Sequence, residues 1–268
     1  MKMQQNKNVP IPYENLRTLY KERITVAEIA EPLARCRSDE PAVDVFDRLD
    51  KRQFEVVGIV EQGSVCGYAK KEDLLAVNVC GEAKKLFSPR DIITSSMPLI
   101  EIFGVLKHSR STFVLDERRD VYIITRSDLQ KIPVRMLLFG LVSLIELHML
   151  RIIRSQFPNR EWQQFMTPGR LQKAHELLEL RRERTEAIDL ADCLQFSDKK
   201  EIIVGSDMLR QKLGFPSKKK GRAIFEGVES LRDKLAHAQD LVIGTTWSRL
   251  FDIIESSEGL LAGLEKCK

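Results

Sequence analysis

The residues of this chain that could carry out a reaction lie together in one hexapeptide, Arg-Asp-Lys-Leu-Ala-His, which runs from Arg232 to His237. An imidazole titrates near neutrality, so His237 could transfer protons. The guanidinium of Arg232 is always charged, and its fork matches the geometry of a phosphate group. Asp233 precedes His237 by one helical turn and could orient the imidazole. This combination is typical of proton transfer beside a phosphate group, with His237 as the proton carrier and Arg232 as the cation that stabilises charge on the phosphate.

The hexapeptide lies in a stretch of helical periodicity, residues 227–242. An apolar stripe at helical spacing predicts a helix that is buried in a bundle. Its members are Ile224, Val228, Leu231, Leu235 and Val242. On an ideal helix Arg232 and His237 are about 140° apart. The two side chains therefore converge only if the helix bends or ends between them, or if a partner chain closes the site.

A second pair, Arg170 and His175, has the same Arg-x4-His spacing. No acid follows Arg170, and the pair begins a charged helix after Thr167 and Pro168. Short motifs also match by chance, so the spacing alone does not choose between the two pairs. The acid at Asp233 favours the pair Arg232 and His237.

The hexapeptide resembles the Arg-x4–6-His signature of the HEPN domains, and the similarity extends loosely to an apolar helix containing Glu146 and to residues 196–199. The resemblance implies an all-helical module over about the last half of the chain. Modules of this family usually form homodimers and are often metal-independent ribonucleases, so the resemblance also implies that Arg232, Asp233 and His237 are catalytic. Glu146 is then either an ion-pair partner of an arginine, which we favour, or a member of the site.

Residues 24–128 show an internal repeat of strand, hairpin, strand and helix. The first copy covers residues 55–75 and the second residues 111–130. A helix that starts at a proline precedes each copy, at Pro41 and at Pro98. The pattern predicts a tandem of two α/β units.

The tandem resembles a pair of CBS motifs, a module that senses adenine nucleotides. In that family a Thr/Ser-x-x-Asp at the strand-to-helix junction holds the ligand, with the hydroxyl on phosphate and the carboxylate on the ribose hydroxyls. The second copy has Thr125 and Asp128 at these positions, whereas the first keeps Asp73 and has Lys70 in place of the hydroxyl residue. The resemblance therefore implies a regulatory adenine nucleotide, ATP, ADP or AMP, bound by Thr125, Asp128 and Asp73.

The same residues also fit a plain helix cap, so nucleotide binding and structural capping both remain open. The glycine that the family usually has three positions before the threonine is Gly67 in the first copy, and Tyr122 takes its place in the second. Three apolar residues would either line an adenine pocket or belong to the core: Ile92, Ile93 and Phe113.

Composition limits the remaining function classes. The five cysteines include no Cys-x-x-Cys pair and no histidine at metal-ligand spacing, which argues against a zinc site and a disulfide framework and favours a reducing cytoplasm. No signal peptide is expected in the polar N-terminus. The apolar run 136–150 is interrupted by Glu146 and His148 and is expected to be a bundle helix too short to span a bilayer. The formal charge of +4 is mild, and basic residues cluster locally at 181–184 and 218–222.

Together these features predict an α+β protein with a flexible arm (1–20), a tandem CBS-like nucleotide-sensing domain (21–132) and a HEPN-like all-α bundle (133–268). The bundle is predicted to have four main helices: residues 134–154, residues 168–191, the helix of the hexapeptide and residues 246–264. The predicted function is a cytoplasmic, homodimeric endoribonuclease of a defence or stress response, regulated by an adenine nucleotide and independent of metal. The alternative is a nucleotide-sensing dimerisation or adaptor protein that catalyses nothing.

Overall fold

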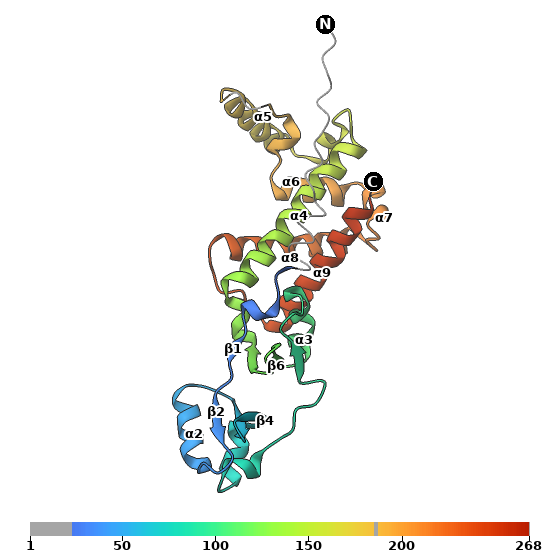
Figure 1. The fold of residues 1–268 in the computed structure, drawn as a ribbon. Coiled ribbons are helices and arrows are strands. Elements are labelled where there is room, and N and C mark those ends of the chain that lie inside the picture. The colour runs from blue at the N-terminus through green and yellow to red at the C-terminus, as the bar shows by residue number, and fades with distance from the viewer. Residues whose placement is uncertain (1–22, 185–186, 268) are drawn as a thin grey trace. The chain divides into compact units, whose positions relative to one another are not determined.

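The computed structural model describes residues 23–184 and 187–267, so the predicted arm 1–20 lies outside the described residues. The chain forms two compact units, with the boundary between Val134 and Arg135 (Figure 1). All strands of the described residues lie in the first unit, and the second unit is helical. The chain therefore has the mixed α and β content that the sequence predicts.

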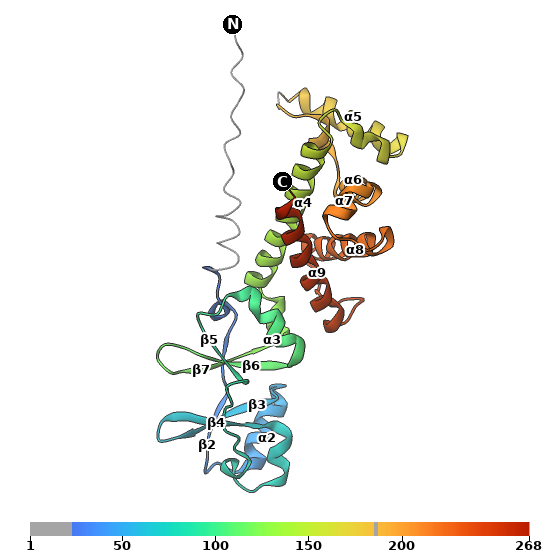
Figure 2. The same cartoon turned by 90° about the vertical axis from the view of Figure 1, so that its right-hand side faces the viewer.

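The first repeat forms a three-stranded sheet with the order β2-β3-β4 (Figure 2). Strand β2 (Arg35–Arg37) runs parallel to β3 (Val56–Glu61), which pairs antiparallel with β4 (Ser64–Lys70). The helical elements of this repeat are α2 (Ala42–Lys51), η3 (Lys71–Ala76) and η4 (Cys80–Ala83). The predicted strand, hairpin, strand and helix are confirmed, and β2 is an addition that the sequence pattern did not predict.

The second repeat has the same arrangement within a four-stranded sheet, β1-β7-β6-β5. Strand β5 (Ile92–Thr94) runs parallel to β6 (Ser111–Leu115), which pairs antiparallel with β7 (Val121–Thr125). Strand β1 (Glu31–Pro32) precedes the first repeat in the chain but pairs with β7 of the second. The helical elements are η2 (Val26–Glu28), η5 (Leu99–Glu101), α3 (Ile102–His108) and η6 (Arg126–Gln130).

The two hairpins close in different ways. Gln62 (φ 50°) and Gly63 (φ 82°) both have positive φ, which a two-residue hairpin turn of type I′ requires. The second turn is longer and is held by the carboxylate of Asp116, whose Oδ1 accepts the N–H groups of Arg118 (2.9 Å) and Asp120 (2.7 Å). Both turns fall where the sequence predicts them.

The helical unit is built around a short helix, α6. The elements that make up this unit are α4 (Ile132–Gln156), η7 (Glu161–Phe165), α5 (Pro168–Arg182), η8 (Leu190–Cys193), α6 (Phe196–Gly205), α7 (Asp207–Lys212), α8 (Lys218–Ala236) and α9 (Trp247–Lys266). Helix α6 buries six of its ten residues, whereas α5 buries two of its fifteen. In Figure 1 and Figure 2 α5 lies apart from α8 and α9. The buried fraction is thus larger in α6 than in α5, although residues 168–191, and not the residues of α6, are predicted as one of the four main helices.

Helix α5 ends at Arg182, well before the predicted end at residue 191. A new turn begins at Asp189, whose carboxylate accepts the N–H of Ala191 at 2.8 Å. Arg154 of α4 holds this turn through Asp189 (3.1 Å) and Asp192 (2.7 Å). The ion pairs with Arg154 therefore stabilise a turn at residues 189–192, where the periodicity of the sequence predicts a continuous helix.

Helix α8 begins at Lys218 and ends at Ala236, so the helix predicted over residues 227–242 is wrong at its C-terminal end. Ala238 has a left-handed backbone (φ 51°), which cannot continue a right-handed helix. Val242 consequently lies beyond the helix and outside the apolar stripe. Leu241, which the pattern did not include, is fully buried instead.

Among the described residues, α4 is the one helix that is long and apolar enough to cross a membrane by length and composition alone. It has 25 residues, so the expectation that its apolar run is too short for a bilayer is wrong. Within its most apolar window 61% of the residues are buried inside the structure, and buried core helices pass the same test.

Candidate functional site

The end of α8 positions the predicted catalytic residues. Arg232 lies in the last turns of the helix and is half-buried, and Asp233 and His237 are exposed. His237 directly follows the helix, with φ −95° and ψ 12°, and its N–H donates to the carbonyl of Asp233 at 3.0 Å. The helix therefore ends between Arg232 and His237, which is one of the conditions for convergence of the two side chains.

The side chains of Arg232, Asp233 and His237 have neither a hydrogen bond nor an ion pair within residues 23–184 and 187–267. The guanidinium and the imidazole are thus available to a ligand. Asp233 makes only the backbone contact with His237, so its carboxylate does not orient the imidazole in this structure.

In the second Arg-x4-His pair, the side chain of the arginine is bound to other residues of the helical unit. The Nη1 atom of Arg170 donates to Asp198 Oδ1 at 2.5 Å and to Ser197 Oγ at 2.9 Å. Asp198 is buried, so the arginine neutralises a carboxylate that has little contact with water. His175 is exposed on α5. Arg170 therefore has a structural partner, whereas the side chain of Arg232 has none in the part of the chain that the structure describes.

Four consecutive residues of α6, 198–201, each form an ion pair with another helix. Asp198 pairs with α5 through Arg170. The other three pairs are Lys199 with Glu146 of α4 (2.7 Å), Lys200 with Glu229 of α8 (2.7 Å) and Glu201 with Arg222 of α8 (2.6 Å). Glu146 is thus an ion-pair partner, as favoured from the sequence, but its partner is a lysine and not an arginine. These ion pairs give residues 198 and 199 of the HEPN-like stretch a role in packing.

The turn after α8 is held by two cations that sequence reasoning missed. Arg135 of α4 donates from Nη1 to the carbonyl of Gln239 (2.9 Å) and from Nη2 to the carbonyl of Lys234 (3.1 Å). Lys234 donates in turn to the carbonyl of Leu241 (3.0 Å), and burial lowers the pKa of this ammonium against the opposing effect of Asp240. The sequence did indicate that Arg135 has a specific role, because Arg135 and Glu146 are the two charged residues (Asp, Glu, Lys or Arg) within the largely apolar residues 133–150.

In the second repeat the predicted ligand residues Thr125 and Asp128 lie at the junction of β7 and η6. Oδ2 of Asp128 accepts the N–H (2.7 Å) and the hydroxyl (2.8 Å) of Thr125, and Oδ1 pairs with Lys131 Nζ at 2.9 Å. The side chain of Asp128 is 10% exposed. The capping arrangement that the sequence left open is therefore present, and a ribose hydroxyl would have to share these oxygens.

In the first repeat Asp73 pairs with Lys85 at 2.6 Å, and this hydrogen bond holds the pKa of the carboxyl below its usual value. A Cβ atom on Gly67 would lie 2.5 Å from the carbonyl oxygen of Lys85. Tyr68 and Lys85 also exchange backbone hydrogen bonds (2.9 and 2.7 Å). The chain itself fills the space beside Gly67.

The predicted adenine-lining residues belong to packed structure. Phe113 is buried, and its ring centroid lies 4.8 Å from those of Tyr68 and Phe87. Ile92 packs against the same cluster, and Ile93 pairs with Val114 in the sheet. Of the two alternatives, the structure supports core packing for Phe113 and Ile92.

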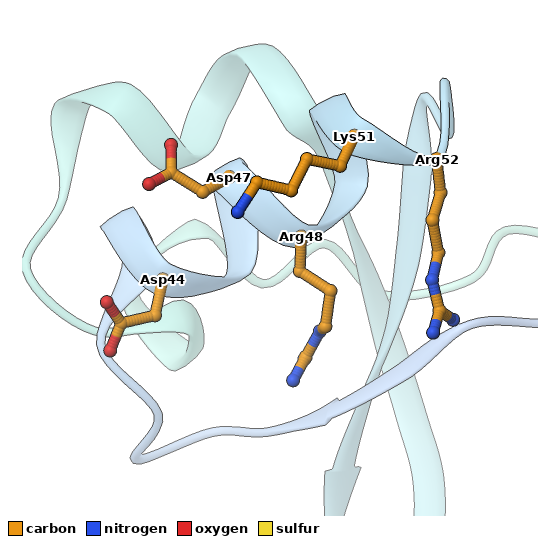
Figure 3. A pocket seen from close by; sticks show the side chains of 5 residues that line it. All are labelled: Asp44, Asp47, Arg48, Lys51 and Arg52. Carbon is orange, nitrogen blue, oxygen red and sulfur yellow. The ribbon is translucent and has the colours of Figure 1, made fainter.

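Two surface pockets lie in the first unit, and neither is lined by Thr125, Asp128 or Asp73. One, of about 420 Å³, lies on α2, where charged side chains point outward from the helix and its end (Figure 3). Its lining residues are Asp44, Asp47, Arg48, Lys51 and Arg52. The other, of about 360 Å³, is lined by Ala27, Ala30, Ser95, Val114, Asp116, Glu117, Arg118 and Tyr122. The first is lined by charged residues alone, whereas ligand pockets usually have apolar walls, and the second has both apolar and charged lining residues.

Within the described ranges no group of three or more His, Cys, Asp or Glu residues could hold a metal ion. All five cysteines are free thiols. Burial raises the pKa of both Cys36 and Cys80, so these two thiols stay protonated.

No protein-family model and no curated protein matches the chain. Solved structures that it resembles include CBSX2 in complex with AMP (17% identity, 39% of this chain and 92% of that chain, TM-score 0.35). Another is the CBS domain of the bacterial CNNM/CorC family Mg²⁺ transporter in complex with ATP (15% identity, 46% of this chain and 93% of that chain, TM-score 0.35). A third is a hemolysin-like protein containing a CBS domain from Oenococcus oeni PSU (12% identity, 44% of this chain and 94% of that chain, TM-score 0.34). Each of these TM-scores lies below 0.5.

Proposed function

We propose that the helical unit is a metal-independent endoribonuclease that acts through Arg232 and His237, and that the tandem-repeat unit regulates it by binding an adenine nucleotide. The observation that carries the ribonuclease proposal is the contrast between the two Arg-x4-His pairs. Arg170 is occupied by Asp198 and Ser197, whereas the side chains of Arg232 and His237 have no partner among the described residues. A guanidinium without a counter-ion, close in sequence to an exposed imidazole, is available to an RNA phosphate.

In the proposed reaction His237 accepts the proton of the attacking 2′-hydroxyl. The 2′-oxygen forms a bond to phosphorus, and the bond from phosphorus to the 5′-oxygen breaks. The leaving 5′-oxygen takes up a proton from water, and His237 afterwards returns its proton to the solvent. Arg232 stabilises the charge that develops on the phosphoryl oxygens. Asp233 orients the imidazole once substrate is bound, a role that its position one turn before His237 allows.

The test is RNA cleavage by the purified protein in the presence of EDTA. His237→Ala and Arg232→Ala should each lower the rate about a hundred- to a thousandfold, the usual loss for one transition-state donor. His175→Ala is the matched control, because it removes the histidine of the other pair. The assignment is wrong if His237→Ala cuts RNA as fast as the parent, or if His175→Ala is the inactive variant.

The regulatory proposal concerns Thr125 and Asp128, with Asp73 as the corresponding acid of the first repeat. It is supported by the orientation of Asp128, since the hydroxyl and the carboxylate that would hold phosphate and ribose are already side by side. AMP and ATP are the nucleotides to test by calorimetry. Asp128→Ala should lose the binding, and equal affinity in parent and variant, or no binding in the parent, would refute the sensing role.

A second candidate function, a dimerisation or adaptor protein, is favoured by the exposed apolar side chains of Met136 and Phe139 on α4. Such side chains on a surface are typical of protein-binding sites. The adaptor function replaces the ribonuclease if the parent protein never cuts RNA, with or without nucleotide. We also propose a homodimer, which light scattering tests, and a monomer mass at micromolar concentration would contradict it.

A further inference from the structure

The turn that carries His237 is fixed by a side chain from another helix. The last carbonyl groups of an α-helix have no partner within the helix. At the end of α8 the guanidinium of Arg135 binds the carbonyl of Lys234 at 3.1 Å and, beyond the helix, that of Gln239 at 2.9 Å. These two carbonyls lie on either side of His237 in the chain, so Arg135 bridges the turn across the histidine.

Further contacts hold the same turn from within. The N–H of Gln239 donates to the carbonyl of Lys234 at 3.0 Å, and the ammonium of Lys234 donates to the carbonyl of Leu241 at 3.0 Å. Ala238 has a φ of 51°, a strained value for a residue with a Cβ atom. Such a conformation persists when the surroundings over-determine it, and here Arg135, Lys234 and the buried side chain of Leu241 do so.

We propose that Arg135 is a positioning residue that sets the direction from which the imidazole of His237 approaches its substrate. This inference rests on the proposed ribonuclease function. Arg135 acts through the two backbone carbonyls and makes no contact with the reacting atoms. Its planar fork holds two acceptors in one fixed geometry, which the single ammonium of a lysine does not do. Reactive side chains need such a supporting contact to stay in a productive orientation.

Arg135→Met removes both donors and keeps an unbranched apolar side chain. We expect kcat for RNA cleavage to fall about a hundredfold, the loss that a displacement of about 1 Å produces in an active site. KM should change little, because Arg232 is still present to bind phosphate. Arg135→Lys should recover part of kcat, since an ammonium can bind one of the two carbonyls.

Arg154→Met is the matched control on the same helix. Arg154 also bridges two acceptors, Asp189 (3.1 Å) and Asp192 (2.7 Å), but these are not in the turn of His237. Both variants lose two contacts of one arginine. Only Arg135→Met should change the geometry of residues 237–241.

Two measurements report on the turn without any RNA. Amide hydrogen exchange across residues 234–243 should be faster in Arg135→Met than in the parent and unchanged in Arg154→Met. The NMR signal of the His237 imidazole, which His237→Ala assigns among four histidines, should shift in Arg135→Met alone.

The inference is overturned if exchange and the imidazole signal are the same in Arg135→Met as in the parent, or if both arginine variants lower kcat equally. A parent protein that does not cut RNA refutes the proposed function. In that case the exchange and NMR measurements still decide whether Arg135 holds the turn.

Discussion

The ion pair between Glu146 and Lys199 offers a sharp test of whether Glu146 has a structural or a chemical role. The pair joins α4 to α6 at 2.7 Å, and the side chains of Lys199 and Glu146 are 8% and 29% exposed. Replacing one partner leaves a charge with little access to water. Replacing both with apolar residues removes the charges together.

The expected magnitudes follow from the burial of the partner that remains. Glu146→Leu leaves the buried ammonium of Lys199 without a counter-ion and should lower the free energy of unfolding by about 3–5 kcal/mol. Lys199→Met leaves Glu146, which reaches solvent more easily, so its loss should be smaller. The double variant should lie within about 1 kcal/mol of the parent or be more stable, because buried ion pairs are often replaced by apolar residues without loss.

Urea unfolding followed by tryptophan fluorescence measures this effect in the helical unit alone, since both tryptophans, Trp162 and Trp247, lie in that unit. RNA cleavage by the double variant is the second measurement. If Glu146 is structural, the double variant is stable and cuts RNA like the parent.

The reasoning is refuted if the double variant loses the sum of the two single losses, because the two charges would then act independently. A double variant that is as stable as the parent but does not cut RNA would place Glu146 in the reactive site instead.

Three further predictions test other parts of the structure. Burial lowers the pKa of His148 below 6.5, so the unfolded state takes up the proton more readily: the free energy of unfolding should be constant above about pH 6.5 and fall as the pH drops from there to the folded-state pKa. Urea unfolding over about pH 5–8 should show this fall in the parent and not in His148→Leu. Gly67→Ala places a Cβ atom 2.5 Å from the backbone oxygen of Lys85 and should lower the free energy of unfolding by about 1–3 kcal/mol. Thermal unfolding measures this loss, and an unchanged melting temperature would show that the backbone at Lys85 moves to make room for the methyl group. Arg170→Met leaves the buried Asp198, which is 7% exposed, without its counter-ion. It should lower the stability of the helical unit about as much as Glu146→Leu, because the charge that remains is equally buried in the two variants, and an unchanged stability would contradict this.

Local sequence patterns determined the elements whose hydrogen bonds join residues close together in the sequence. The hairpin from β3 to β4 is an example, because alternating residues on either side of Gln62 and Gly63 specify two strands and a two-residue turn. The change from strand to helix periodicity near Pro133 likewise predicted where the helical unit begins. In both cases the information lies within a few residues of the element itself.

The ends of helices depended on contacts between residues far apart in the chain. Arg135 holds carbonyl groups 99 and 104 residues away, and the turn after Ala236 is built around these contacts. The apolar stripe continued to Val242 in the sequence, but periodicity carries no information about where a distant guanidinium will lie. The early end of α5 has the same cause, because Arg154 binds the turn that follows it.

The tertiary structure adds a difference between the two Arg-x4-His pairs that the sequence does not show. In the sequence Arg170 and Arg232 have the same spacing to a histidine, and the local differences are the acid at Asp233 and the start of a charged helix at Arg170. Folding brings Arg170 to Asp198, 28 residues further along, and leaves the side chain of Arg232 without an ion pair in the part of the chain that the structure describes. A short motif specifies which groups are present, but whether a charge is neutralised depends on which residues the fold brings within a few ångströms of it.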